Sequence, residues 1–264
     1  MTMPHRTLHR LLVLALLATL ALVTGVAHAA TPAPEPNSST PTLSPSPTDA
    51  VVPRTVKLSD ERLLSRWAHP ARMSDVYSRH SKRSKKVARL RFFTEDGFPE
   101  VYLLLREYTD ANENEWVQIR VPKRPNGRTG WVPRDALGPY NVNRFQLTVS
   151  RKTLRATLYK RGKRVWSSRV GVGAPGTVTP AGRFWIREKF RFKDTPVYGT
   201  HAIGTSAYAP TLSDWPNGGV VGIHGTNQPE LIPGRPSHGC IRVKNADIAR
   251  LWRLLPLGTP LRIT

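Results

Sequence analysis

The sequence predicts a mostly β protein with an amphipathic helix near its C-terminus. From about residue 87 onward, short segments alternate apolar with polar side chains, and turn-forming pairs such as Asp96-Gly97 and Asn126-Gly127 separate them. This is the period expected of strands in antiparallel sheets. Residues 245–255 place apolar side chains on one stripe of a helix, at 248, 251, 252 and 255. We expect Asn245 to be the N-cap of this helix and Pro256 to end it.

The first 56 residues have the composition of a targeting signal followed by a tether. Arg6 and Arg10 precede an apolar run over residues 11–23, and Ala27-His-Ala supplies a small-x-small cleavage pattern. The run is short for a membrane span, so residues 1–29 are interpreted as a signal peptide. Residues 30–56 are rich in Pro, Ser and Thr and predict a disordered tether.

Residues 57–138 predict a small first domain. Residues 58–67 have apolar side chains at helical spacing after Ser59 or Asp60, which predicts a short helix. About five short strands follow before residue 133, and they predict a small β-barrel. Gly138-Pro139 is a natural boundary, and residues 143–264 are predicted to form a second domain. From residue 144 to 172 apolar side chains alternate with polar ones, and residues 160–163 are predicted to form a hairpin turn.

The chain of 264 residues carries a net charge of +22. In a cytosolic protein, basic runs such as residues 82–86 would suggest nucleic acid as a partner. Export argues against nucleic acid and favours the anionic polymers of a cell wall. A solvated basic face without a partner explains the charge equally well at this stage.

Cys240 is the only cysteine in the sequence, so it cannot form an internal disulfide. It follows Ser-His-Gly (237–239) and not an apolar run, which favours a reactive thiol over a packing residue. A cysteine nucleophile needs a base and N–H donors for the oxyanion. His224 and His238 are the candidate bases, and the backbone N–H groups of Gly239 and Cys240 are the candidate donors.

No cofactor is expected. Residues 171–176 contain the glycine spacing of a dinucleotide fingerprint, but the strand-like residues 183–187 follow where a helix is required. A zinc site could be assembled from histidines 201, 224 and 238 with the single cysteine. The sequence offers neither a second cysteine nor a helical His-x-x-x-His pair, which argues against zinc. His201 is interpreted as a structural residue.

Two strings carry a specific resemblance to a known family. Ile-His-Gly-Thr (223–226) and Ser-His-Gly-Cys-Ile-Arg (237–242) resemble the active-site signature of the YkuD-type L,D-transpeptidases, which cross-link peptidoglycan. Residues 179–184 and 198–204 are similar to other recurring stretches of that family. The resemblance covers roughly residues 144 to 264 and implies a YkuD-like β-sandwich catalytic domain. Gly-Trp-Val (130–132), after Trp116, resembles bacterial SH3-like modules.

The resemblance implies a role for each matching residue. Cys240 would be the nucleophile that attacks the carbonyl before the terminal D-alanine of a tetrapeptide stem. His224 would act as general base and then acid, with its second nitrogen held by the Gly225 carbonyl. The N–H groups of Gly239 and Cys240 would stabilise the oxyanion, and His238 would support the site.

Three further residues are implied on the substrate side of the site, namely Arg242, Ser237 and Gly225. The implied partners are the peptidoglycan stems, as donor tetrapeptide and acceptor amine, with anionic wall polymers as further partners. Neither nucleic acid nor a cofactor is implied, and a cell-wall-associated monomer is expected.

Several alternatives are weighed against a transpeptidase that forms 3→3 cross-links. An L,D-carboxypeptidase would use the same residues with water as the acceptor, and a non-catalytic wall-binding protein would not need the intact Cys and His set. Papain-like endopeptidases place the histidine after the cysteine, and no histidine follows Cys240. Sortases place it before, but they lack the Ser-His-Gly-Cys string and use a wider separation.

Overall fold

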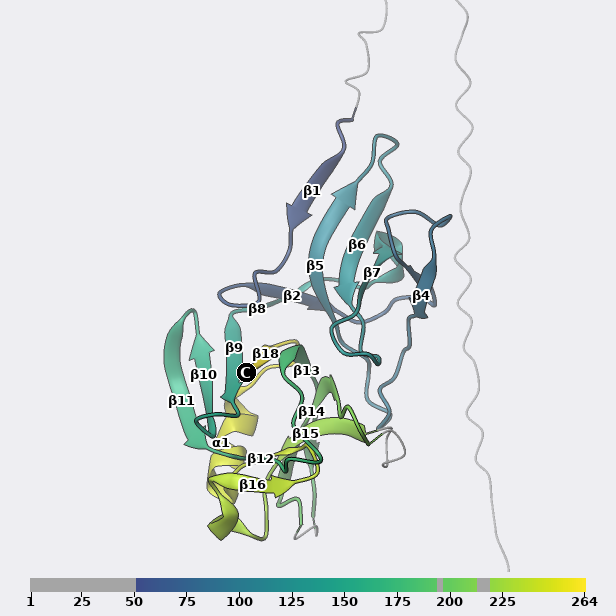
Figure 1. The fold of residues 1–264 in the computed structure, drawn as a ribbon. Helices are drawn as coiled ribbons and strands as arrows, with labels where there is room; N and C mark the ends of the chain where they lie inside the picture. Colours follow the sequence, from purple (N-terminus) through teal and green to yellow (C-terminus); the bar gives the residue numbers. More distant parts are fainter. Residues whose placement is uncertain (1–50, 194–196, 213–218) are drawn as a thin grey trace, which may run out of the picture. The chain divides into compact units, whose positions relative to one another are not determined.

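The computed structural model describes residues 51–193, 197–212 and 219–264. The predicted signal peptide and most of the predicted tether lie outside these residues. The described residues form two β-sheets, one α-helix and short 3₁₀ turns (Figure 1), which confirms the mostly β fold class. None of the helices in this part of the chain is long and apolar enough to cross a membrane.

The first sheet has eight strands. They are β1 (Arg54–Lys57), β2 (Ser65–Ala68), β3 (Asp75–Tyr77), β4 (Lys86–Arg89), β5 (Tyr102–Thr109), β6 (Glu115–Arg120), β7 (Thr129–Pro133) and β8 (Asn141–Asn143). Their order is β4-β3-β7-β6-β5-β2-β8, and β1 also pairs with β5. Apolar side chains on alternate positions, among them Leu104, Ile119 and Val132, build a small core for this sheet. Its identification as an SH3-like module stays a prediction.

The predicted helix over residues 58–67 is wrong. One carboxylate oxygen of Asp60 accepts the N–H groups two, three and four positions along the chain, at 2.7, 2.7 and 3.0 Å. Glu61 has a left-handed backbone with φ of 59°. A side-chain acceptor that competes for these N–H groups closes a tight turn in place of a helix, and β2 follows directly.

Two predicted boundaries are also corrected. The tether cannot extend to residue 56, because β1 pairs antiparallel with residues 106–109 of β5. The β-branched side chains of Thr55 and Val56 favour this edge strand. The first sheet extends past Gly138 to Asn143, because β8 pairs with β2.

The second sheet has ten strands and carries the helix. They are β9 (Phe145–Ser150), β10 (Arg155–Lys160), β11 (Lys163–Arg169), β12 (Gly171–Gly173), β13 (Gly182–Arg191), β14 (His201–Tyr208), β15 (Val220–His224), β16 (Gly234–Ser237), β17 (Ile241–Arg242) and β18 (Pro260–Ile263). Their order is β11-β10-β9-β18-β13-β14-β15-β17-β12-β16. The predicted β10–β11 hairpin is confirmed, and Arg161 and Gly162 have φ of 50° and 77°, as its tight turn requires.

Helix α1 (Asn245–Leu254) confirms the predicted amphipathic helix and buries Ile248 and Leu251. The predicted cap is wrong, because Lys244 occupies the N-cap position. The amide oxygen of Asn245 instead accepts the N–H of Thr226 at 2.9 Å. This side chain therefore serves the loop after β15 and not its own helix.

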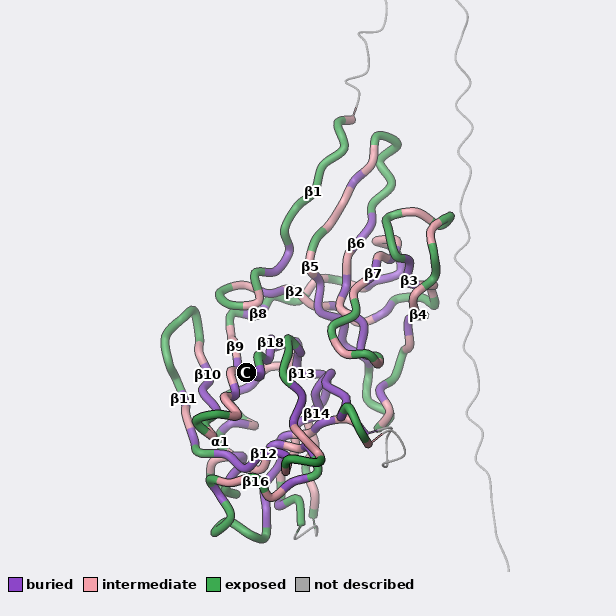
Figure 2. Tube along the Cα trace, in the orientation of Figure 1, coloured by how far each residue is buried: buried purple, intermediate pink, exposed green. Residues whose placement is uncertain are grey.

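The core of the second sheet gathers side chains from strands far apart in the sequence. Leu147, Leu158, Ile186, Ile203 and Ile223 are all fully buried, and α1 adds Leu251 to the same cluster. Figure 2 shows long buried stretches along β13 and β14 of this sheet. Burying a side chain of this size stabilises the fold by roughly 1.5–3 kcal/mol. This core supports β15 and β17, on which the candidate site is built.

A buried charge cluster joins the two sheets. Arg187 on β13 is fully buried, and its Nε donates to Glu100 at 2.7 Å while its Nη2 donates to Glu95 at 3.0 Å. Arg91 donates to the same two carboxylates, at 2.9 Å each. Burial alone would raise the pKa of Glu95, but Arg187, Tyr208 and Arg91 outweigh it and lower that pKa to about 2.

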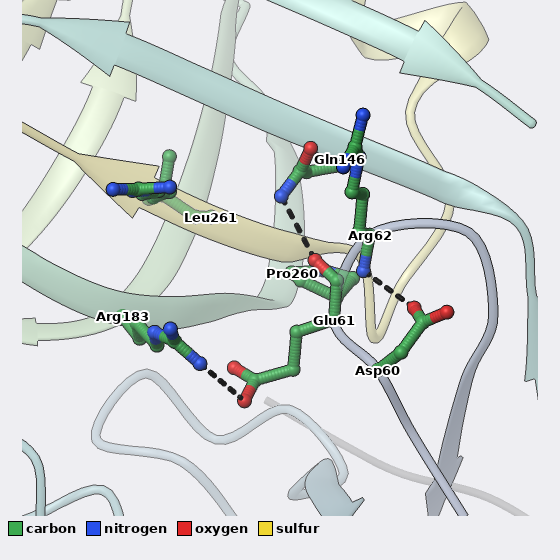
Figure 3. A pocket seen from close by; sticks show the side chains of 8 residues that line it. Asp60, Glu61, Arg62, Gln146, Arg183, Pro260 and Leu261 are labelled. Carbon is green, nitrogen blue, oxygen red and sulfur yellow. Dashed lines mark hydrogen bonds and ion pairs between the residues drawn. The ribbon is translucent and has the colours of Figure 1, made fainter. Parts of the chain in front are cut away.

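A second contact between the sheets is centred on Glu61 (Figure 3). Its backbone carbonyl accepts a hydrogen bond from Gln146 on β9 at 2.9 Å. Its carboxylate pairs with Arg120 at 2.7 Å and with Arg183 on β13 at 3.6 Å. The cavity beside it, of about 130 Å³, is lined by charged residues but contains none of the predicted catalytic ones.

Candidate active site

Cys240 lies in the short connection between β16 and β17. Strand β17 pairs in parallel with β15, so that Ile241 lies opposite Ile223 and Arg242 opposite His224. The N–H of Gly222 on β15 donates to the Cys240 sulfur at 3.4 Å. Parallel pairing thus brings the end of β15 beside the cysteine, although sixteen positions separate Cys240 from His224.

The loop before the cysteine is held by two hydroxyl groups. Ser237 Oγ donates to the Cys240 carbonyl at 2.6 Å and accepts the Gly239 N–H at 3.2 Å. Thr179 donates to the Gly239 carbonyl at 2.7 Å and accepts the N–H of Gly173 at 2.9 Å. Gly239 has φ of 123°, a backbone conformation that favours glycine. Ser237 was predicted on the substrate side, but its hydroxyl makes both of these hydrogen bonds within the loop itself.

His224, the last residue of β15, is buried and has a defined tautomer. Its Nδ1 lies 2.6 Å from the Gly225 carbonyl oxygen, the contact expected from the resemblance. A carbonyl oxygen only accepts, so Nδ1 carries the hydrogen and the lone pair is on Nε2. A Cβ at Gly225 would lie 2.2 Å from Asn245 Oδ1, so this close packing requires glycine. The Tyr198 ring contacts the imidazole edge-on, with centroids 4.8 Å apart.

The electrostatics keep both reactive groups neutral. Burial lowers the pKa of His224, and the positive charge of Arg242 lowers it further. The hydrogen bond to the Gly225 carbonyl raises it in part, and the resulting pKa is about 4. Burial also raises the pKa of the Cys240 thiol, although the Gly222 N–H and Arg242 favour the thiolate. At neutral pH the cavity that both residues line therefore contains a neutral thiol and a neutral imidazole.

A cavity of about 250 Å³ brings the predicted side chains together. Cys240, His224, His238, Ser237 and Arg242 all line it, with His238 exposed. The remaining walls come from the residues before β14, from those between β14 and β15, and from the start of β15: Val197, Tyr198, Ala209, Leu212, Gly219, Val220 and Val221.

The predicted oxyanion donors differ in their hydrogen bonding. The Gly239 N–H already donates to the Ser237 hydroxyl, so binding an oxyanion there requires that hydrogen bond to be exchanged. Within the described residues, the Cys240 N–H has no acceptor. Arg242, predicted on the substrate side, donates to Gln228 at 3.0 Å.

His201 is not among the residues that line this cavity. Its ring packs edge-on against Trp252, with centroids 5.4 Å apart, and its Nδ1 lies 2.8 Å from the Thr200 hydroxyl. Residues 51–193, 197–212 and 219–264 contain no group of three or more His, Cys, Asp or Glu side chains suited to hold a metal ion.

The roles of Thr179 and Asn245 in holding the candidate site were not predicted from the sequence. Thr179 fixes the loop that carries the cysteine, and its only sequence signal is its place in the family-like stretch 179–184. Asn245 fixes the turn after His224, but its position before an amphipathic helix suggested a cap instead.

The comparisons with known proteins match the part of the chain that forms the second sheet. Residues 144–263 match the L,D-transpeptidase catalytic domain of the YkuD family. The L,D-transpeptidase named YkuD in Bacillus licheniformis is 33% identical over 121 residues, which cover 46% of this chain and 65% of that protein. Its namesake in Bacillus subtilis is 31% identical over 125 residues, which cover 47% of this chain and 66% of that protein.

The chain thus spans just under two thirds of the length of these two relatives. Among solved structures, the catalytic domain of an E. faecium L,D-transpeptidase is 27% identical, with a TM-score of 0.34; the match covers 45% of this chain and 95% of that one. The family match and the curated relatives support an L,D-transpeptidase catalytic domain of the YkuD family in residues 144–263.

Proposed function

We propose that this protein is an exported peptidoglycan L,D-transpeptidase that forms 3→3 cross-links through a thioester on Cys240. The observation that carries the proposal is the pairing in one cavity of a thiol with a neutral histidine whose Nδ1 is fixed by a backbone carbonyl. The names of the relatives and the family match give the reaction class.

The first half-reaction forms the acyl-enzyme. The donor is a tetrapeptide stem, and the reacting carbonyl joins the L-centre of its diamino acid to the terminal D-alanine. As the sulfur bonds to this carbonyl, the thiol proton passes to Nε2 of His224. The C–N bond then breaks, and His224 returns the proton to the departing D-alanine amine. The cysteine is left as a thioester.

The second half-reaction transfers the acyl group to an amine of another stem. His224 takes a proton from the attacking amine, the thioester bond breaks, and the thiolate of Cys240 is reprotonated. The Cys240 N–H is suited to stabilise both oxyanions, and donors of this kind typically contribute about 3 kcal/mol each. The Gly239 N–H would join it when Ser237 releases it.

Arg242 is proposed to orient the donor. It lines the cavity, and its position opposite His224 suits an ion pair with the carboxylate of the terminal D-alanine. Export to the wall is proposed from the predicted signal peptide, and the net charge of +22 favours contact with anionic wall polymers.

The test is product analysis with purified disaccharide-tetrapeptide and the secreted protein. A 3→3 dimer with release of D-alanine is expected, and Cys240→Ala should produce none. Tripeptide without dimer would replace the transpeptidase with the L,D-carboxypeptidase. Absence of both products from the wild-type protein would exclude either enzyme and favour a wall-binding role.

A further inference from the structure

The turn between β6 and β7 in the first sheet contacts the end of β14 in the second. Asn126 Nδ2 donates to the Tyr208 carbonyl at 2.8 Å, and the Tyr208 N–H donates to Asn126 Oδ1 at 3.1 Å. One side-chain amide thereby replaces a peptide group of a neighbouring strand. The Tyr208 hydroxyl also donates to the Pro122 carbonyl at 3.1 Å.

Arg124 of the same turn extends this contact by several residues. Its Nε and Nη2 donate to the Ala209 carbonyl at 3.2 and 2.9 Å, and Nη2 also reaches the Leu212 carbonyl at 3.2 Å. Its guanidinium lies over the Tyr208 ring, 5.0 Å from the centroid. Hydrogen bonds from a charged donor are about twice as strong as neutral ones. The turn therefore fixes the backbone of two positions after β14.

These two positions are walls of the candidate active site. Ala209 and Leu212 line the cavity that contains Cys240. A Cβ at Gly239, the residue before the cysteine, would lie 3.7 Å from the Ala209 methyl group. The wall held by Arg124 thus faces the nucleophile loop directly.

The packing on the other side of this wall is also tight. The Ala209 N–H donates to the Gly219 carbonyl at 2.8 Å. A Cβ at Gly219 would lie 1.9 Å from the Leu212 carbonyl oxygen and 2.8 Å from Arg124 Nη2. Displacement of the guanidinium would therefore release the carbonyls that shape the cavity.

We propose that Arg124 and Asn126 are positioning residues of the active site, supplied by the first sheet. This inference rests on the proposed function. Both residues lie outside residues 144–263, the part of the chain that matches the catalytic domain. The first sheet is then part of the catalytic unit, because it sets the distance between the Ala209 wall and the Cys240 loop. A misplacement of about 1 Å in such a wall can cost up to roughly 100-fold in rate.

The test uses the secreted protein and the variants Arg124→Ala and Arg124→Lys. Arg128→Ala is the matched control, since it removes the same charge from an exposed position of the same turn. Two reactions of Cys240 are measured. The first is acylation by disaccharide-tetrapeptide, which gives a rate and a KM for the donor, and the second is the rate of alkylation by iodoacetamide. The donor must fit the cavity, whereas iodoacetamide needs only an accessible thiol.

Arg124→Ala is expected to raise KM for the donor about tenfold or more. The alkylation rate and the melting temperature should stay close to those of the wild-type protein. The KM of Arg124→Lys should lie between those of the wild-type protein and Arg124→Ala, because lysine keeps the charge but loses the planar pair of donors. Arg128→Ala should match the wild-type protein in every measurement.

A KM in Arg124→Ala equal to that of the wild-type protein overturns the inference. An equal decrease in the rates of acylation and alkylation also overturns it, because it would indicate a general structural role. If Arg124→Ala does not fold, Asn126→Asp decides. It keeps the acceptor for the Tyr208 N–H but removes the donor to the Tyr208 carbonyl, so a raised KM supports the inference and an unchanged KM overturns it. Absence of acylation in the wild-type protein itself would instead refute the proposed function.

Discussion

Two polar regions in the interior of this molecule differ in the ionisation of their side chains. Between the sheets, Arg187 and Arg91 are ionised and each contacts the carboxylates of both Glu95 and Glu100. In the candidate active site, His224 is buried and Cys240 is half-buried, and desolvation shifts both pKa values toward the neutral forms. The first region gives stability through paired charges, whereas the second leaves a proton free to move.

The difference comes from the partners that each group has. Every carboxylate of the interface cluster has an arginine, which compensates for lost hydration. Within the described residues, His224 has a backbone carbonyl as its hydrogen-bond partner, and the charge of Arg242 opposes a second positive charge. The imidazolium is therefore unfavourable until a substrate brings a developing negative charge into the cavity.

The largest expected effect breaks the reactive region. His224→Gln removes the proposed base for the thiol proton, so the rate of acylation by disaccharide-tetrapeptide should fall roughly 1,000-fold. The melting temperature should change little. His238→Gln, at the other histidine of the cavity, is the comparison and should cost less than about tenfold. Equal losses in the two variants would mean that the roles of the histidines are misassigned.

The second-largest effect is expected from removing one arginine of the charge cluster between the sheets. Arg187→Met leaves two buried carboxylates with only Arg91 as a cationic partner, and the free energy of unfolding should fall by about 3–5 kcal/mol. Chemical denaturation measures this loss. Adding Glu100→Gln to Arg187→Met should restore part of it, because one of the uncompensated charges is then gone. A loss below about 1 kcal/mol would show that the cluster contributes little.

The pH dependence of thiol alkylation sharpens the comparison. Because the pKa of Cys240 is raised above the ordinary value of 9.0, the iodoacetamide rate should still rise at pH 9. A thiolate–imidazolium pair would instead give a plateau that begins at acidic pH. A plateau between pH 5 and 8 would therefore contradict a neutral pair.

The smallest effect concerns a carboxyl group beside the paired cluster. Burial raises the pKa of Glu188 to about 7, although Thr94 and Arg187 act against it. Its unfolded value is 4.5, so the native state keeps a proton between pH 4.5 and 7 that the unfolded chain has lost. The free energy of unfolding from this group should therefore decrease as pH rises through that window.

Glu188→Gln removes this dependence without changing the size of the side chain. Melting temperatures at pH 5 and pH 8 should show a gain for the variant at pH 8 relative to the wild-type protein. The difference between the two proteins reports Glu188 together with its neighbour Asp96, and it cancels the contribution of distant groups such as His224. An identical pH slope in both proteins would mean that Glu188 is ionised in the fold.

The sequence was sufficient where a signal is local. The alternation of residues 145–169 predicted a hairpin, the stripe from Ile248 predicted α1, and the strings around His224 and Cys240 predicted which side chains share a cavity. In each case the spacing along the chain matches the period of the element or the signature that carries the residues.

Prediction failed where one side chain contacts a distant or unexpected backbone group. The Asp60 carboxylate closes a turn in a stretch with helical spacing, and Asn245 bonds the loop of Thr226 instead of its own helix. Thr179 and Arg124 act across sheets or strands that only the folded chain brings together. Periodicity contains no information about such contacts.

The most direct test of this account is the intact mass of the protein mixed with disaccharide-tetrapeptide. We expect a transient adduct that lacks the mass of the terminal D-alanine and maps by peptide digestion to Cys240. Cys240→Ala should fold normally, because the thiol adds little packing, and should show no adduct. An adduct on another residue, or release of D-alanine by Cys240→Ala, would contradict the account.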